Sequence, residues 1–255
     1  MNDIARPDWA GPEQRLDGRT VLVVGGVGGV GEGVVNALLT LGATVVATSR
    51  RQERAVEFAD RFGAERLHAV VLDALSPTFT DDVAGLSRRF GPFDAVIIAI
   101  ASWGEQGRKP LLALSDAEWD VLVAENQTAV FRAYRSLFPV IAADGMLLQL
   151  NGLSADLAFP GAGGVALTAA ATKSMTRTVA AETAGRGPRV YELVLGVIRT
   201  RARRLNGIDD PRWIDGEEIG IHLSELLNRT SRLAAEPLQY FVDKRTGPSS
   251  AVPAV

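Results

Sequence analysis

The run Gly25-Gly-Val-Gly-Gly-Val-Gly31 has the composition and position of a phosphate-binding turn. It directly follows residues 20–24, a β-branched and aliphatic run that predicts a buried strand, and a helical pattern begins at Glu32. A phosphate at a helix N-terminus needs free N–H donors and close approach of the backbone, which side chains would block. The run therefore predicts a phosphate site. The alternative is a flexible turn without a ligand.

Short apolar runs alternate with longer helical patterns along the rest of the chain. This alternation predicts a doubly wound, Rossmann-like α/β fold, a parallel sheet of about seven strands with helices on both faces. The expected strands are 20–24, 44–48, 67–72, 93–100, 146–150, 189–195 and 239–242. The expected helices are 32–41, 51–62, 79–90, 165–184 and 217–227, with a long helix within 116–141.

The chain has 255 residues without an internal repeat or a linker-like stretch, which favours one domain. We expect a core over about residues 15–243 and loose ends at 1–14 and 246–255. The absence of cysteine excludes disulfides and thiolate chemistry, and two histidines leave little for a metal site. A net charge of −3 argues against nucleic-acid binding. Because no targeting segment or membrane span is visible, we expect a soluble cytoplasmic protein without membrane or metal partners.

The spacing Gly25-x-x-x-Gly29-x-Gly31, with the preceding segment Leu16-Asp-Gly-Arg-Thr-Val-Leu-Val-Val-Gly25, resembles the short-chain dehydrogenase/reductase family. The resemblance covers roughly residues 15 to 243. It implies hydride transfer with a nicotinamide cofactor and a small-molecule substrate. It also implies a homodimer or homotetramer formed through long helices.

The end of the second strand reads the adenine ribose in such folds, where an acid favours NAD and an arginine accommodates the 2′-phosphate of NADP. Here Ser49-Arg50-Arg51 contains no acid, so we expect NADP(H), with Arg50 as the main contact. A solvated arginine at a helix start is the alternative for Arg50. The full set of expected cofactor contacts is Gly25, Val27, Gly28, Gly29, Val30, Gly31, Ser49, Arg50, Arg51, Asp73, Ala74, Ala99, Ile198 and Thr200.

The family's catalytic serine, tyrosine and lysine are expected at Gly152, Val165 and Ala169. Two anchors agree on this register: Pro160-Gly161, which matches the segment before the family tyrosine, and Ala180-Ala-Glu182, which matches the end of the following helix. Valine cannot donate a proton and alanine cannot bind a ribose hydroxyl. Ordinary alcohol or ketone chemistry by the family mechanism is therefore not expected.

Asn126 matches the family's helix asparagine, with a structural role as its alternative. Lys173 lies one helical turn after Ala169, so its ammonium could reach the ribose, although a packing or solvated lysine is equally consistent with the sequence. Ser154 is a further candidate for substrate contact. The arginine-rich segment 199–204 predicts either an anion-binding lid or a solvated charge run.

These features favour an NADP(H)-binding oxidoreductase with an atypical active site. Such an enzyme would reduce an already activated group, such as an iminium ion or a conjugated double bond. Two alternatives remain: a catalytically silent NADP(H) sensor or scaffold, and a non-redox cyclase or isomerase that uses the same cleft.

Overall fold

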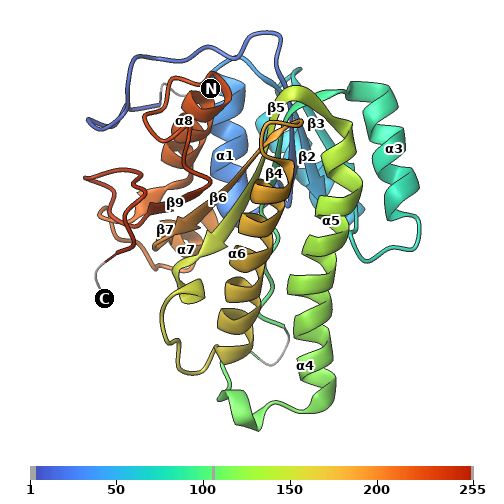
Figure 1. Cartoon of the computed structure of the whole chain (residues 1–255), viewed down its shortest axis with the longest axis vertical. Coiled ribbons are helices and arrows are strands. Elements are labelled where there is room, and N and C mark those ends of the chain that lie inside the picture. The colour runs from blue at the N-terminus through green and yellow to red at the C-terminus, as the bar shows by residue number, and fades with distance from the viewer. Residues whose placement is uncertain (1–3, 105–106, 254–255) are drawn as a thin grey trace.

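A computed structural model describes residues 4–104 and 107–253. Seven parallel strands form one sheet in the order β3-β2-β1-β4-β5-β6-β9, as the sequence predicts (Figure 1). The order reverses between β1 and β4, and in such sheets ligands bind beside this point at the carboxyl ends of the strands. The strands are β1 Thr20–Val24, β2 Thr44–Ser49, β3 Leu67–Val71, β4 Phe93–Ile98, β5 Ile141–Gly152, β6 Arg189–Leu195 and β9 Leu238–Phe241.

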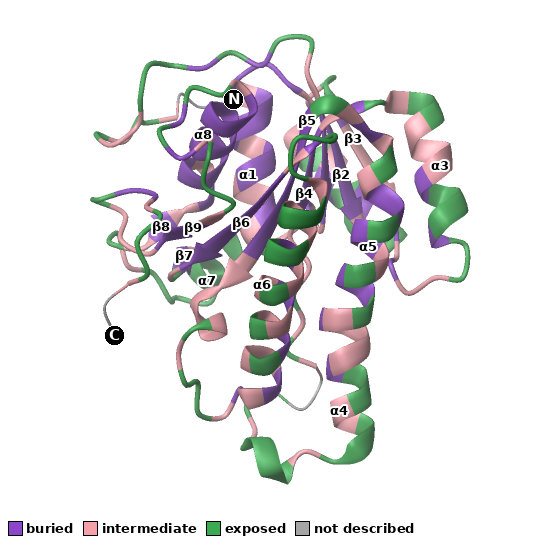
Figure 2. Ribbon diagram, viewed as in Figure 1, coloured by how far each residue is buried: buried purple, intermediate pink, exposed green. Residues whose placement is uncertain are grey.

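Helices cover both faces of this sheet, and the central strands are almost entirely buried between them (Figure 2). One face packs against α1 Gly29–Thr40, α2 Gln52–Phe62 and α8 Gly216–Leu227. The other packs against α3 Phe79–Phe90, α5 Ala129–Leu137 and α6 Gly163–Thr183. Helix α4, Asp116–Val123, continues into α5 through a π-helical turn at Ala124–Thr128 and extends below the sheet in Figure 1.

Helices α1 and α8 approach each other through small residues. A Cβ atom on Gly33 would lie 2.5 Å from the Cα of Gly216, and one on Gly220 would lie 2.3 Å from the Cβ of Ala37. Larger side chains at these glycines would therefore push α8 away from α1. This close contact fixes the start of α1, where the phosphate site is predicted.

A short ladder and a short helix near the cleft were not predicted from the sequence. Strand β7, Ile198–Arg199, pairs with β8, Ile214–Asp215, and α7, Arg201–Leu205, lies between them. Two-residue strands carry no periodicity, so only the fold defines them. Among the described residues, no helix is long and apolar enough to cross a membrane.

The described parts of the two ends, 4–14 and 246–253, are anchored at a few residues, whereas the sequence predicts loose ends at 1–14 and 246–255. Residues 1–3 and 254–255 lie outside the described residues. The rings of Trp9 and Phe241 meet edge to face with centroids 5.3 Å apart. The N–H of Gly11 donates to Oε1 of Glu225 at 2.8 Å, and Ser249 pairs with Tyr240. Burial of the Trp9 indole between distant segments holds the N-terminal stretch in place.

Candidate active site

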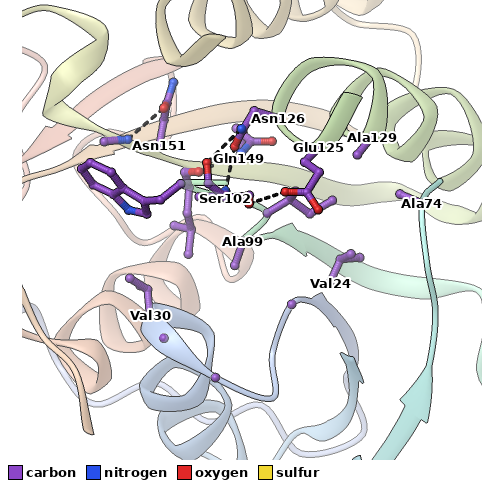
Figure 3. Close-up of a pocket in the computed structure, with 18 of the residues that line it drawn as sticks. Val24, Val30, Ala74, Ala99, Ser102, Glu125, Asn126, Ala129, Gln149 and Asn151 are labelled. Atoms are coloured by element: carbon purple, nitrogen blue, oxygen red, sulfur yellow. Dashed lines mark hydrogen bonds between the residues drawn. The ribbon is translucent and has the colours of Figure 1, made fainter. Parts of the chain in front are cut away.

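A cleft of about 970 Å³ lies where β1, β2, β4 and β5 end. Figure 3 shows Val24, Val30 and Ala99 facing this space from β1, α1 and the loop after β4. Of the expected site residues, those that line the cleft are Gly25, Gly28, Gly29, Val30, Ser49, Arg50, Arg51, Asp73, Ala74, Ala99, Asn126, Ser154, Ile198 and Thr200. Val27, Gly31 and Lys173 do not line it.

The glycine-rich turn leaves open space at the start of α1. Gly28 is the N-cap of α1 and makes no side-chain cap, and a Cβ on Gly28 or Gly29 would meet nothing within 4 Å. Both residues line the cleft, so a phosphate has room to reach the first N–H groups of the helix. These residues therefore fit the pyrophosphate of a dinucleotide.

Two other glycines of the turn are required by close packing. A Cβ on Gly25, which has φ +79°, would lie 2.6 Å from the carbonyl oxygen of Ala99. A Cβ on Gly31 would lie 2.6 Å from the carbonyl oxygen of Gly25. Gly31 thus supports the turn from beneath, which explains why it does not line the cleft. Val27 packs against the hydrophobic core instead.

Arg50, which follows β2, forms an ion pair across the cleft. Its Nη1 donates to Oε1 of Glu125 at 2.7 Å. The other carboxylate oxygen of Glu125 accepts a hydrogen bond from the hydroxyl of Ser102 (Figure 3). All three residues line the cleft. No pattern in the sequence predicts a role for Glu125, because the ion pair joins residues that are far apart along the chain.

Asn126 lies in the π-helical turn and clamps the loop after β4. Its Oδ1 accepts from the N–H of Ser102 at 2.7 Å, and its Nδ2 donates to the carbonyls of Ser102 at 2.9 Å and Leu122 at 3.0 Å (Figure 3). Every polar atom of this buried side chain is therefore bonded to backbone. The geometry gives Asn126 a structural role, and it places the Ser102 hydroxyl beside Glu125.

Comparisons with known proteins identify the family. The sequence model described as Enoyl-(Acyl carrier protein) reductase matches residues 25–223. The gluconate 5-dehydrogenase of Gluconobacter oxydans (strain 621H) is 31% identical over 192 residues, 72% of this chain and 73% of that protein. A solved structure titled as a short chain dehydrogenase/reductase family protein has a TM-score of 0.74 and 25% identity, covering 90% of this chain and 97% of that chain. This chain belongs to the short-chain dehydrogenase/reductase family.

A second solved structure shows the same fold. The gluconate 5-dehydrogenase of Burkholderia cenocepacia J2315, solved in complex with NADP and tartrate, has a TM-score of 0.74 at 23% identity and covers 93% of this chain and 98% of that chain. Members of the short-chain dehydrogenase/reductase family are NAD(P)(H)-dependent oxidoreductases, and this chain is an oxidoreductase of that family.

The positions that the sequence assigns to the family's serine, tyrosine and lysine, Gly152, Val165 and Ala169, all line the cleft. Among the described residues, no tyrosine, lysine or histidine lines it. The three tyrosines of the chain are buried elsewhere: Tyr134, Tyr191 and Tyr240. Burial raises the pKa of Tyr134 far above its usual value, which makes that phenol a poor acid–base group. The described part of the chain also holds no cluster of three or more metal-ligating side chains.

Lys173 does not line the cleft, whereas the sequence offered a ribose contact as the alternative to a packing or solvated lysine. Its ammonium forms an ion pair with Asp156 and donates to the hydroxyl of Tyr240 at 2.9 Å. Burial lowers the pKa of Lys173, but its bonds to Asp156 and Tyr240 outweigh that effect and raise it. The two partners come from the loop after β5 and from β9, so sequence spacing along α6 could not reveal them.

Replacing Lys173 with methionine is expected to lower the free energy of unfolding by about 1–2 kcal/mol, because Asp156 loses a charged partner. The dissociation constant for NADPH is expected to change by less than about twofold, as the ammonium lies outside the cleft. Urea unfolding and calorimetric titration measure the two quantities. The Lys109→Met variant, which removes a lysine paired with Glu118, is the matched control. Weakened NADPH binding with unchanged stability would restore the ribose-binding role.

Glu192 is a buried acid directly behind the cleft. It is fully buried in the middle of β6, and its Oε1 accepts from Nδ2 of Asn151 at 2.6 Å. Burial raises its pKa to about 7, against the lowering effect of the Asn151 hydrogen bond. Asn151 lines the cleft and also donates to the carbonyl of Ala169 at 2.8 Å. Glu192 thus supports a cleft residue next to Gly152. The sequence feature that could have revealed Glu192 is its position as a lone glutamate within an apolar run.

In the arginine-rich segment 199–204, Arg199 forms an ion pair with Asp209, whereas Arg203 lines the cleft. Arg199 pairs with Asp209 at 2.5 Å. The hydrogen bond to Asp209 raises the pKa of Arg199 by more than burial lowers it. Arg203 lines the cleft, donates to the carbonyl of Ile198 at 2.7 Å and lies over the ring of Trp213. Arg203 therefore adds positive charge at the nicotinamide end predicted from Ile198 and Thr200.

Proposed function

We propose that this chain binds NADP(H) and transfers hydride to a small organic molecule whose acceptor carbon is already activated. An iminium ion is the preferred acceptor class, and a conjugated double bond is the second. The observation that carries the proposal is the composition of the cleft. The phosphate-binding turn and Arg50 lie in it, whereas no described tyrosine, lysine or histidine does.

The residues of this chain fit the two ends of the dinucleotide. The N–H groups at the start of α1, beside Gly28 and Gly29, suit the pyrophosphate. Arg50, with Arg51 beside it, suits the 2′-phosphate, because guanidinium groups bind phosphate through paired donors. Asp73 and Ala74, which line the cleft, would contact the adenine, and Ile198 and Thr200, which also line it, would contact the nicotinamide. A bound NADPH supplies the hydride.

The described wall at the reacting end supplies positioning without a tyrosine, lysine or histidine as proton donor. Val165 and Ala169 present apolar side chains that can pack against the acceptor and position it. An iminium ion becomes a neutral amine when hydride adds to its carbon, so no proton is needed. A conjugated double bond leaves an enolate that must take a proton from water. A simple ketone leaves an alkoxide, which requires a stronger acid than the hydroxyls of Ser154 and Thr168 that line the cleft.

The test begins with calorimetric titration of the purified protein with NADPH and NADH. NADPH consumption is then followed with a cyclic iminium salt and with a ketone of the same ring size. We expect NADPH to bind and the iminium alone to be reduced. Rapid ketone reduction would refute the proposal. Binding without hydride transfer to any acceptor would favour the sensor or scaffold, and binding of neither nucleotide would favour a non-redox cyclase or isomerase.

We also infer that two copies of the chain associate through the helices α4, α5 and α6. Large apolar side chains are about half exposed on these helices: Val121 at 45%, Phe131 at 51% and Leu167 at 47%. Sedimentation velocity is expected to give a dimer or tetramer. Leu167→Arg is expected to shift it toward monomer, because a charge would be buried in the interface. A monomeric wild-type protein would contradict the inference.

A further inference from the structure

The guanidinium that suits the 2′-phosphate already has an anionic partner within the cleft. Arg50 donates to Glu125 at 2.7 Å, and the two side chains come from the turn after β2 and from the π-helical turn on the opposite wall. The Arg50 side chain is 60% exposed, whereas the Glu125 side chain is only 21% exposed. Glu125 is therefore the more enclosed member of the pair, and Arg50 the more accessible one.

Glu125 is held in place and ionised. The hydroxyl of Ser102 donates to it from the loop after β4, and the backbone of Ser102 is itself clamped by Asn126. Burial opposes ionisation of Glu125, but the hydrogen bonds from Ser102 and Arg50 outweigh it and hold its pKa below the usual value. The carboxylate thus carries a full negative charge at neutral pH, and the Asn126 clamp limits its withdrawal from the cleft.

We propose that Glu125 determines cofactor selectivity by competing with the 2′-phosphate of NADP(H) for Arg50. This inference rests on the proposed dinucleotide binding. A 2′-phosphate that reaches Arg50 must share the guanidinium with Glu125 or displace it, and in either case two anions lie close together. NAD(H) has a neutral 2′-hydroxyl there and meets no such repulsion. Arg51 and Arg54 also line the cleft and add the positive charge that keeps NADP(H) binding favourable.

Replacing Glu125 with glutamine tests the proposal, because glutamine keeps the size and removes the charge. NADPH is expected to bind about tenfold more tightly to Glu125→Gln than to the wild type. NADH affinity is expected to change by less than about twofold. The gain for NADPH should shrink at high ionic strength, since salt screens the repulsion. Calorimetric titration of both proteins with both nucleotides measures the four dissociation constants at each of two salt concentrations.

Glu57→Gln is the matched control, because it removes one carboxylate from an exposed position on α2 outside the cleft. It is expected to leave both affinities unchanged. If Glu125→Gln does not fold, Glu125→Ala serves the same comparison. Wild-type NADPH binding with no gain in the Glu125 variants overturns the selectivity role alone. Binding of neither nucleotide to the wild type overturns both the selectivity role and the proposed function.

Discussion

Replacing Glu192 with glutamine is expected to stabilise the fold far more at alkaline than at acidic pH. Relative to the wild type, the gain in free energy of unfolding should be about 2–3 kcal/mol larger near pH 8 than near pH 5. Burial raises the pKa of Glu192 to about 7, whereas an exposed glutamate in the unfolded chain has the usual pKa of 4.5. The unfolded chain therefore releases this proton at lower pH than the folded protein does.

The direction of the pH effect follows from the pKa of Glu192, which is higher in the folded than in the unfolded protein. Between about pH 4.5 and 7 the folded state binds more protons at Glu192, so the wild type loses stability as the pH rises through that window. Above about pH 7 the loss is complete, because the acid is ionised in both states. Glutamine does not titrate, so its variant lacks this loss. Any change in packing or in the Asn151 hydrogen bond is common to both pH values and cancels in the comparison.

Urea unfolding of both proteins at the two pH values gives the difference directly. Glu182→Gln, which removes an exposed carboxylate at the end of α6, is the control and is expected to show little pH-dependent change. A Glu192→Gln effect that is equal at both pH values would show that the carboxyl titrates normally. Asn151 connects Glu192 to the cleft wall through a hydrogen bond. Ionisation of Glu192 is therefore expected to change the hydrogen bonding of Asn151 beside Gly152.

The Gly28→Asp variant is expected to lose dinucleotide binding while its helix becomes more stable. Gly28 is the N-cap of α1, with an extended backbone and no side-chain cap, and an added Cβ meets nothing within 4 Å. Aspartate there caps the helix and favours folding by about 0.5–1 kcal/mol. Its carboxylate also occupies the space for the pyrophosphate, so NADPH and NADH should both bind at least about 100-fold more weakly.

Thermal unfolding and calorimetric titration measure these two opposite effects in one variant. Gly28→Asn is the matched control, because it caps the helix with a neutral side chain of nearly the same size. It is expected to weaken binding less than Gly28→Asp does. A Gly28→Asp protein that binds both nucleotides normally would place the pyrophosphate elsewhere. The Arg50 site differs in this respect, since changes there are expected to affect NADPH much more than NADH.

The sequence by itself determined the elements with strong local patterns. The buried part of β1 is a continuous apolar run, and α1 carries apolar residues at helical spacing, so neighbouring residues specify both. The phosphate-binding turn was equally clear, because Gly25 and Gly31 meet steric demands that are set within a few residues. The register from the flanking anchors placed Gly152, Val165 and Ala169, and all three line the cleft.

Only the tertiary structure decided which polar and charged side chains meet. Arg50 and Glu125, Lys173 and Asp156, and Glu192 and Asn151 are pairs from separate elements, and no periodicity predicts them. The contact of Trp9 with Phe241 in β9, which holds the N-terminal stretch, likewise joins segments that are far apart in the sequence. Local patterns record burial and backbone geometry, whereas pairing depends on how strands and helices are ordered in space. The pairing of Glu125 with Arg50 and that of Glu192 with Asn151 are therefore decided by the fold.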